Sequence, residues 1–218
     1  MPPGPRTSRR GTTRRSAADR VGPGGPPACH PGHVHGLLLA AGAGTRMGRP
    51  KALVRGADGE PWLVRGVRAL AEGGCTQVTV VLGAAAEDAL PLLEGTGATA
   101  VVAADWADGM SASLHAGLAA ALATDADAVV VTLVDLPDVG AEVVRRLLEP
   151  RPGPGTLRRA SYDGIVGHPV VLGRDHWAGI DDTARGDRGA RDYLARHVVA
   201  AVECGDLATG VDLDRPPG

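Results

Sequence analysis

Short apolar runs alternate with segments of helical periodicity along most of this chain. Four mostly apolar runs predict buried strands at residues 37–39, 77–82, 98–103 and 128–133. Apolar residues recur at helical spacing in residues 61–71, 86–93, 111–124 and 140–148. Such an alternation of strands and helices predicts an α/β fold, in which helices cover both faces of a mostly parallel central sheet.

Two segments interrupt this rhythm. Residues 1–35 are rich in Arg, Pro, Gly, Ser and Thr, so we expect a disordered tail, and they lack the apolar stretch of a secretory signal. Residues 36–218 are expected to form a single domain. Within it, the proline-rich segment 149–155 precedes further strands and a helix, which are predicted as follows: strands at 157–162 and 168–172, a helix at 189–197 and a last strand at 198–203.

Two local predictions concern the segments beside these elements. Residues 52–54 read as a short extended segment after a glycine-rich loop. Ser111 precedes a helical pattern and is a residue type that often caps a helix N-terminus.

The composition narrows the classes of protein that this chain can represent. The apolar runs are far shorter than the ~20 residues of a membrane-spanning helix, so no membrane association is expected. The net charge of −2 argues against a general nucleic-acid binder. The three cysteines are widely spaced and form no CxxC pattern, which favours a reducing, cytoplasmic compartment.

The segment from Gly36 to Lys51 carries the strongest chemical signal. A buried strand runs into a loop of small residues that contains Arg46 and ends at Lys51, the only lysine among the 23 Lys and Arg residues. Glycines let backbone N–H groups approach an anion closely, and the two side chains add full positive charges. A compact ammonium where every other cation is an arginine suggests a specific need for lysine. The loop therefore predicts a site for a nucleoside triphosphate.

Acidic residues are expected near the same edge of the sheet. Asp135 follows the buried strand at 128–133, and Asp212 and Asp214 form a second acidic pair near the C-terminus. Ligands of such sheets bind at the carboxyl ends of the strands, where the loops 40–51, 104–111 and 134–138 would meet. Mg²⁺ prefers one or two carboxylates together with phosphate oxygens. A cationic loop and a metal-binding acid together favour nucleotidyl transfer, with pyrophosphate as the leaving group.

The stretch LAAGAGTRMGRPKAL at residues 39–53 resembles the signature loop of the molybdenum cofactor nucleotidyltransferases. Five further stretches are similar to motifs of this family, in the same order: D-W-x-x-G-M-x-x-S-L at 105–114, D-x-P at 135–137, G-x-P-V at 167–170, G-D-x-G-A-R at 186–191 and D-I-D-x-P at 212–216. The resemblance covers about residues 35–217 and implies a Rossmann-like nucleotidyltransferase fold.

The resemblance also implies the roles of particular residues. The nucleotide would contact Leu39, Ala40, Ala41, Gly42, Gly44, Arg46, Lys51, Gly83, Asp105 and Gly109. The catalytic residues would be Arg46, Lys51 and Asp135, and the Mg²⁺ ligands would be Asp135, Asp212 and Asp214. Four residues would lie toward the second substrate, namely Ser111, Ser113, His168 and Asp187.

The loop also bears on the choice of nucleotide. Its Ala40-Ala41-Gly42 form resembles the cytidylyltransferase branch of the family, whereas the guanylyltransferase branch usually has A-G-G. The implied reaction transfers CMP from CTP to the phosphate of a molybdopterin-type cofactor and releases pyrophosphate. A molybdenum hydroxylase would be the corresponding protein partner.

Several alternatives stay open at this point. The enzyme could be a guanylyltransferase, or it could act on a sugar phosphate or an alcohol phosphate. A non-catalytic chaperone that delivers the molybdenum cofactor is a second class, against which the combination of Arg46, Lys51 and Asp135 argues. A dinucleotide-dependent oxidoreductase is a third, but the glycines at 42, 44 and 48 are spaced one residue too widely for that fingerprint.

Overall fold

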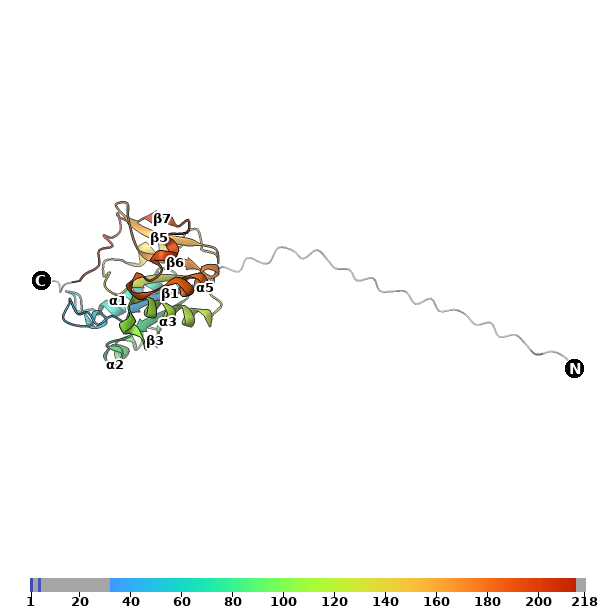
Figure 1. The fold of residues 1–218 in the computed structure, drawn as a ribbon, viewed down its shortest axis with the longest axis horizontal. Helices are drawn as coiled ribbons and strands as arrows, with labels where there is room; N and C mark the ends of the chain where they lie inside the picture. The colour runs from blue at the N-terminus through green and yellow to red at the C-terminus, as the bar shows by residue number, and fades with distance from the viewer. Residues whose placement is uncertain (2–3, 5–31, 215–218) are drawn as a thin grey trace. The chain divides into compact units, whose positions relative to one another are not determined.

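The computed structural model describes residues 1, 4 and 32–214 of the 218-residue chain. The chain divides into two units, Met1–His30 and Pro31–Gly218, and the second is described here (Figure 1). Most of the predicted tail, residues 1–35, lies outside the described residues. Its last two residues were assigned wrongly, because Val34 and His35 are buried in the first strand, where the His35 imidazole and the Thr79 hydroxyl are 2.9 Å apart.

The described part is built on one seven-stranded sheet. Its strands are β1 (Val34–Ala40), β2 (Gln77–Leu82), β3 (Thr99–Val102), β4 (Ala128–Leu133), β5 (Leu157–Tyr162), β6 (Ile165–Gly173) and β7 (Ala200–Glu203). They are ordered β3-β2-β1-β4-β6-β5-β7. Only β6 runs antiparallel to its neighbours in this sheet, which confirms the predicted mostly parallel α/β architecture.

Helices connect the strands. The α-helices are α1 (Trp62–Glu72), α2 (Ala86–Ala89), α3 (Met110–Leu122), α4 (Ala141–Leu147), α5 (Trp177–Thr183) and α6 (Arg191–Leu194). Short 3-10 turns lie at η1 (Lys51–Leu53), η2 (Leu90–Leu93), η3 (Trp106–Asp108), η4 (Arg174–His176) and η5 (Gly186–Arg188). None of the described helices is long and apolar enough to cross a membrane.

The sheet separates two apolar cores. Successive side chains of a strand point to opposite faces, so Leu38 packs with α1 and α4 while Leu37 packs with α3 and α5. Because both faces are covered, the central strands are mostly apolar, which is the pattern that allowed their prediction.

Two local predictions were wrong and one helix was missed, each for an identifiable reason. Residues 51–53 form the turn η1, in which the Val54 N–H donates to the Lys51 carbonyl. Ser111 does not cap α3, because Gly109, with φ of 106°, takes that position. Helix α5 was not predicted, since its fully buried side chains, Trp177 and Ile180, are too few to show a helical period.

Candidate functional site

The loop between β1 and η1 is held in a tight turn. The Met47 N–H donates to the Gly44 carbonyl at 2.9 Å, and the buried Met47 side chain anchors the loop in the core beneath it. Gly44 has φ of 62°, and a Cβ there would lie 1.9 Å from the Arg49 carbonyl oxygen. Only glycine therefore allows the chain to fold back at this point and place Lys51 at the sheet edge.

Lys51 lies at the centre of a chain of ion pairs. Its Nζ is 2.5 Å from Oδ2 of Asp135 and 2.6 Å from Oδ1 of Asp214. Arg46 donates to the other oxygen of Asp214 at 3.1 Å. The Lys51 and Asp135 side chains are only 18% and 12% exposed. Arg46 and Lys51 thus contact acids from two other segments of the chain.

Burial and ion pairing have opposite effects on the pKa of Lys51. Burial lowers the pKa of Lys51, but hydrogen bonds to Asp135 and Asp214 outweigh it, so that the pKa is raised overall. The hydrogen bond from Lys51 in turn lowers the pKa of Asp214. Lys51 and Asp214 therefore both remain charged at neutral pH.

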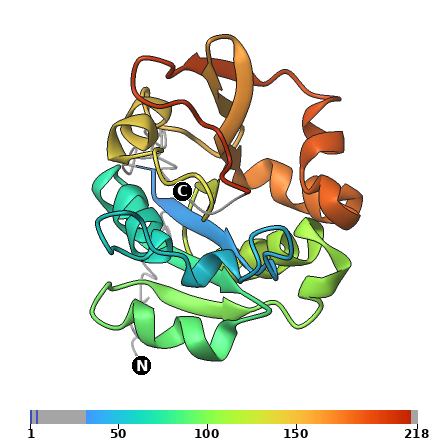
Figure 2. The same cartoon turned by 90° about the vertical axis from the view of Figure 1, so that its left-hand side faces the viewer.

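Asp214 belongs to residues 207–214, which we call the C-terminal strap. The strap also carries Asp212. Asp138 accepts hydrogen bonds from the Thr209 N–H at 2.7 Å and from its hydroxyl at 2.6 Å. Further along, the Leu213 N–H donates to the Asp135 carbonyl at 2.9 Å. Figure 2 shows the dark red strap descending from β7 into the middle of the unit, beside the carboxyl end of the blue strand β1. These anchors place Asp212 and Asp214 beside Asp135.

The three acids form a group that fits a divalent cation. Asp135, Asp212 and Asp214 each offer a carboxylate oxygen, and these oxygens lie within 4.8 Å of one another. Hard cations such as Mg²⁺ and Mn²⁺ prefer oxygen donors of this kind. The ammonium of Lys51 already bridges two of these carboxylates, which shows that they attract a cation.

Two adjoining cavities meet at this group. The loop cavity has a volume of about 500 Å³ and is lined by the glycine-rich loop, Lys51, Trp106, Asp135 and Asp214, among others. The large cavity, of about 710 Å³, lies between β5, β6, α6 and the strap. Four lining residues are common to both: Leu39, Met110, Leu133 and Asp187. The acids therefore lie where two bound molecules would meet.

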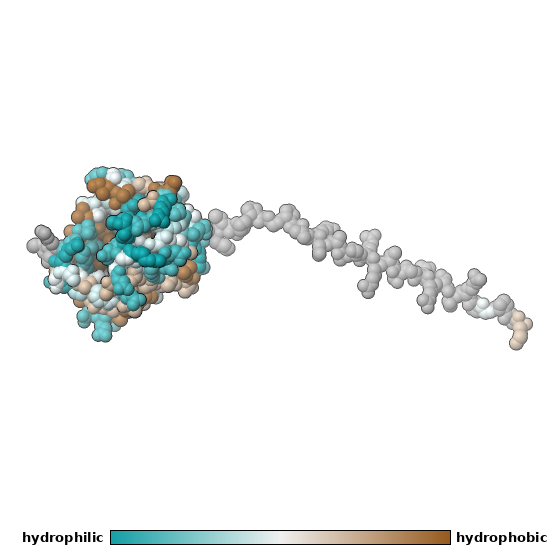
Figure 3. Space-filling model, viewed as in Figure 1, coloured by the Kyte–Doolittle hydropathy of each residue, from teal (hydrophilic) through white to brown (hydrophobic). Residues whose placement is uncertain are grey.

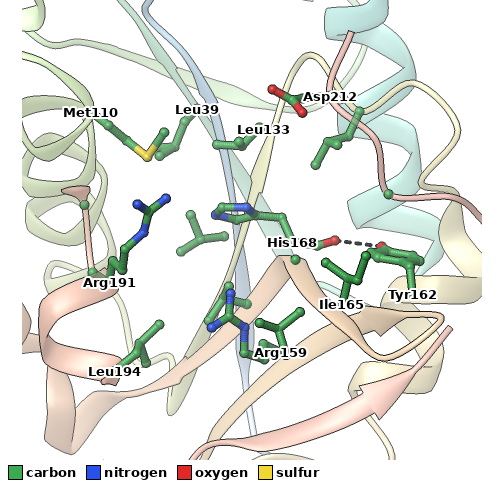
Figure 4. Close-up of a pocket in the computed structure, with 18 of the residues that line it drawn as sticks. Leu39, Met110, Leu133, Arg159, Tyr162, Ile165, His168, Arg191, Leu194 and Asp212 are labelled. Carbon is green, nitrogen blue, oxygen red and sulfur yellow. Dashed lines mark hydrogen bonds between the residues drawn. The ribbon is translucent and has the colours of Figure 1, made fainter. Parts of the chain in front are cut away.

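The large cavity is mostly apolar with a few basic groups. Figure 4 shows Arg159, His168 and Arg191 projecting into it from β5, β6 and α6. Tyr162 donates its hydroxyl hydrogen to the His168 carbonyl at 2.7 Å and so fixes this part of β6. Burial, followed by the charges of Arg159 and Arg191, lowers the pKa of His168 to about 4, so the imidazole is neutral at pH 7.

The rim of this cavity carries apolar as well as charged side chains. The exposed side chains Ile165, Val166 and Val211 all line it. Figure 3 shows apolar surface near the end of the unit that carries β5 and β7, and a hydrophilic surface over the middle. A molecule that enters the large cavity can therefore contact apolar side chains at the rim.

The structure brings most of the predicted residues to these two cavities. The loop cavity is lined by Leu39, Ala40, Ala41, Gly42, Gly44, Arg46, Lys51, Gly109, Ser113, Asp135, Asp187 and Asp214. The large cavity is lined by His168, Asp187 and Asp212.

Three predicted residues lie elsewhere. Gly83 lies behind the loop, where the N–H of the following Ala84 donates to the Ala41 carbonyl. Asp105 and Ser111 line a third cavity of about 580 Å³ beside α3 and α5. The Ser111 hydroxyl is buried there without a partner among the described atoms.

Arg159, Tyr162 and Arg191 were missed as site residues by the sequence reasoning. Arg191 closes the G-D-x-G-A-R stretch, so its motif could have identified it. Arg159 stands two residues after the core residue Leu157, and a charge at a core-facing strand position is a signal that was available.

Comparisons with known proteins agree with this geometry. A family model described as the MobA-like NTP transferase domain matches residues 36–202. The chain is 36% identical over 191 residues to nicotine blue oxidoreductase of Paenarthrobacter nicotinovorans, covering 83% of this chain and 92% of that protein.

Solved structures from mycobacteria are also similar. An Rv0371c homolog from Mycobacterium sp. strain JC1 has 30% identity and a TM-score of 0.71, covering 84% of this chain and 90% of that one. A manganese complex of Rv0371c from Mycobacterium tuberculosis has 26% identity and a TM-score of 0.62, covering 80% and 89% of the respective chains.

Proposed function

Because the chain belongs to the family of MobA-like NTP transferase domains, a family of nucleotidyltransferases, we propose that it transfers CMP from CTP to the phosphate of a molybdopterin-type cofactor. In this reaction an oxygen of the acceptor phosphate attacks the α-phosphorus of CTP. The bond from that phosphorus to the bridging oxygen breaks, and the β and γ phosphates leave as pyrophosphate. The observation that carries the proposal is the group of Lys51, Asp135 and Asp214 at the junction of two cavities.

Each part of the group has a role in this reaction. The triphosphate would lie in the loop cavity, where Arg46 and Lys51 balance its negative charge. Asp135, Asp212 and Asp214 would hold a divalent cation, proposed to be Mg²⁺, which neutralises and orients phosphate oxygens when bound. Lys51 would exchange its carboxylate partners for phosphate oxygens as the nucleotide binds.

The large cavity would hold the acceptor. Its apolar walls suit a flat heterocyclic body, and Asp187 and Met110 line both cavities at the place where the two substrates would join. The preference for CTP rests on Ala41, since the A-A-G form of the loop is similar to that of cytidylyltransferases. A molybdenum hydroxylase would receive the product.

The reaction would take place in the cytoplasm. Within the described part of the chain, Cys75 and Cys204 are buried free thiols, which suits a reducing compartment.

Pyrophosphate release tests this proposal directly. CTP, GTP and UTP are each incubated with Mg²⁺ and one acceptor at a time: molybdopterin cofactor, a sugar phosphate or an alcohol phosphate. We expect release with CTP and the molybdopterin cofactor, and isothermal titration should show tighter binding of CTP than of GTP. Release confined to a sugar phosphate, or to GTP, would overturn the proposed substrate pair.

A second candidate is an oxidoreductase activity, which the name of the 36% identical relative favours. A large cavity with apolar walls would also accept an extended aromatic substrate. The site geometry favours nucleotidyl transfer, because an ion-pair group of Lys51, Asp135 and Asp214 suits phosphate chemistry. Spectrophotometric assay of nicotine blue with NADH or NADPH decides between them, and turnover without CTP would favour the second candidate.

A further inference from the structure

Arg159 occupies an unusual position for a charged residue. It lies on β5 opposite Val170 of β6, and it faces the same core as Leu157 and Leu172. Its Nε is buried and has no hydrogen-bond partner among the described atoms. A buried guanidinium nitrogen without a partner is costly, so its presence here requires an explanation.

Arg191 extends toward the same space from α6. Figure 4 shows both guanidinium groups projecting into the large cavity near His168. Burial, and then the charge of Arg191, lower the pKa of Arg159, as expected for a partly buried cation with a second cation nearby. Within residues 32–214, no carboxylate forms an ion pair with Arg159 or Arg191, although other arginines of the site do have partners.

Arg188 shows the contrast within the same cavity. It also lines the large cavity, but its Nε donates to Asp192 at 2.6 Å and its Nη2 contacts the other oxygen of that carboxylate. The charge of Arg188 is therefore already balanced inside the protein. Arg159 and Arg191 lack this balance, so an anion from outside is the natural partner.

We propose that Arg159 and Arg191 form a subsite for an anionic group of the second substrate, separate from the phosphate that is nucleotidylated. In Figure 4 Asp212, Leu39 and Leu133 lie along one side of the cavity and Arg159 along the other, with His168 between them. The phosphate would meet the nucleotide near Asp212, and the second anion would bind at the arginine pair. The assignment of this cavity to the acceptor rests on the proposed function.

This subsite defines a class of acceptor. The walls between the two ends include the apolar side chains of Val131, Val170 and Leu172. These three side chains cannot hydrogen-bond to sugar hydroxyl groups, so this part of the wall suits an apolar or aromatic body better than a sugar. The acceptor is therefore a molecule with an apolar or aromatic body that carries an anion at each end.

The test uses tungstate, a tetrahedral dianion, as the probe. Isothermal titration is carried out with the full-length protein saturated with Mg²⁺ and a non-hydrolysable CTP analogue, so that the loop cavity is filled. Arg159→Gln and Arg191→Gln should each weaken tungstate binding about tenfold or more, the usual cost of a lost charge-assisted hydrogen bond. The matched variant Arg188→Gln loses the same charge from the same cavity and should change the affinity less than about twofold, because Asp192 already balances Arg188.

Steady-state kinetics gives a second readout that a structural role would not move. Arg191→Gln, whose side chain lies on the surface helix α6, should raise the KM of the acceptor while the KM of CTP and kcat stay unchanged. Arg159→Lys should restore part of the tungstate affinity that Arg159→Gln loses. If Arg159→Gln fails to fold, Arg191→Gln and Arg188→Gln still decide the question.

The outcomes separate this proposal from the proposed function. Equal tungstate affinity in the wild type, Arg191→Gln and Arg188→Gln would overturn the subsite, whatever activity is found. Arginine-dependent tungstate binding in a protein that does not nucleotidylate the molybdopterin cofactor would support the subsite and overturn only the proposed acceptor.

Discussion

The loop cavity and the large cavity share lining residues but differ in whether their cations form ion pairs within the protein. In the loop cavity the cations are already paired, since Lys51 contacts Asp135 and Asp214, and Arg46 contacts Asp214. In the large cavity Arg159 and Arg191 form no ion pair within the described part of the chain.

The difference indicates two modes of binding. A triphosphate that enters the loop cavity must compete with carboxylates for Lys51, so its binding is an exchange of partners. A divalent cation resolves this competition, because it can replace the ammonium between the acids. An anion that enters the large cavity displaces no protein carboxylate from the arginine pair. Binding there needs only the removal of water from the ligand and the two side chains.

Among the variants considered, substitution of Lys51 in the loop cavity should lower activity most. Lys51→Met deletes the charge nearest to the expected position of the phosphates, and kcat for pyrophosphate release should fall by about 10²–10³-fold, as for other preorganised groups at transferring centres. Lys51→Arg should recover only part of the rate, because a planar fork cannot reproduce a compact ammonium. The measurement is steady-state pyrophosphate release with CTP and acceptor.

Arg68 provides the control for this variant. It is an exposed cation on α1 that pairs with Glu60, away from both cavities. Arg68→Met should leave kcat within about twofold of the wild type. A Lys51→Met enzyme with unchanged kcat would show that the paired group is structural only.

Metal binding should depend on the strap. Asp212→Asn and Asp214→Asn each remove a carboxylate from the acidic group, and the Kd for Mn²⁺ should rise by about ten- to a hundredfold, a range reported even for groups that act through a metal ligand. Electron paramagnetic resonance of free Mn²⁺ measures this Kd. Asp192→Asn, at the Arg188 pair, should leave it unchanged. Equal Kd values in all three variants would rule out the strap acids as ligands.

Gly210 belongs to the C-terminal strap, which lines the large cavity and carries Asp214 to the loop cavity. It has φ of 63°, and a Cβ at this position would lie 2.1 Å from the Tyr162 ring. Gly210→Ala should displace the strap and lower kcat by about tenfold or more, because small displacements of reacting groups are costly. Gly97→Ala is the control, since Gly97 has φ of 75° but open space around it. If both variants keep full activity, the packing of the strap on Tyr162 does not position the acids.

The smallest expected effect is on stability, and it comes from Glu203 at the outer wall of the large cavity. Glu203 accepts hydrogen bonds from the Ser161 hydroxyl at 2.7 Å and from the Gly205 and Asp163 N–H groups, both at 2.9 Å. These bonds, led by that from Ser161, lower the pKa of Glu203 to about 2. A carboxyl group with a lowered folded-state pKa stabilises the protein above its unfolded value of 4.5, and this contribution is lost as the pH falls toward about 2.

Urea unfolding of the wild type and of Glu203→Gln between pH 2 and pH 7 measures this contribution. The difference between their midpoints should be largest above about pH 5 and should close toward pH 2. A difference that is independent of pH would show that the charge of Glu203 contributes nothing. Glu87→Gln, at an exposed carboxylate on α2, is the matched control for the loss of one charge.

The sequence allowed prediction of the features that depend on local pattern. The strands at 77–82 and 128–133 were predicted with the observed bounds, because strands buried on both faces are mostly apolar. The convergence of Lys51, Asp135 and Asp214 follows from the rule that loops at the carboxyl ends of parallel strands meet. Their direct ion pairs could not be predicted, since they depend on the path of the strap across Tyr162.

Long-range packing explains the other failures. Arg159 was overlooked because its proposed role depends on Arg191. That residue is distant in sequence and projects into the same cavity from α6. Asp105 lies in the same motif as Gly109, yet the turn η3 follows it and its side chain lines another cavity. A motif gives the order of residues along the chain, but side-chain direction depends on the turns between them.

The strap has a consequence for the order of events during protein synthesis. The ribosome makes Lys51 and Asp135 long before it reaches Asp212 and Asp214, so a nascent chain can complete β1 to β4 while two of the three acids are still missing. Under the proposed function, the three-acid group is therefore incomplete on a partly made chain, even after its glycine-rich loop has folded. Docking of the strap onto Asp138 and Tyr162 would then act as the final maturation step of the enzyme.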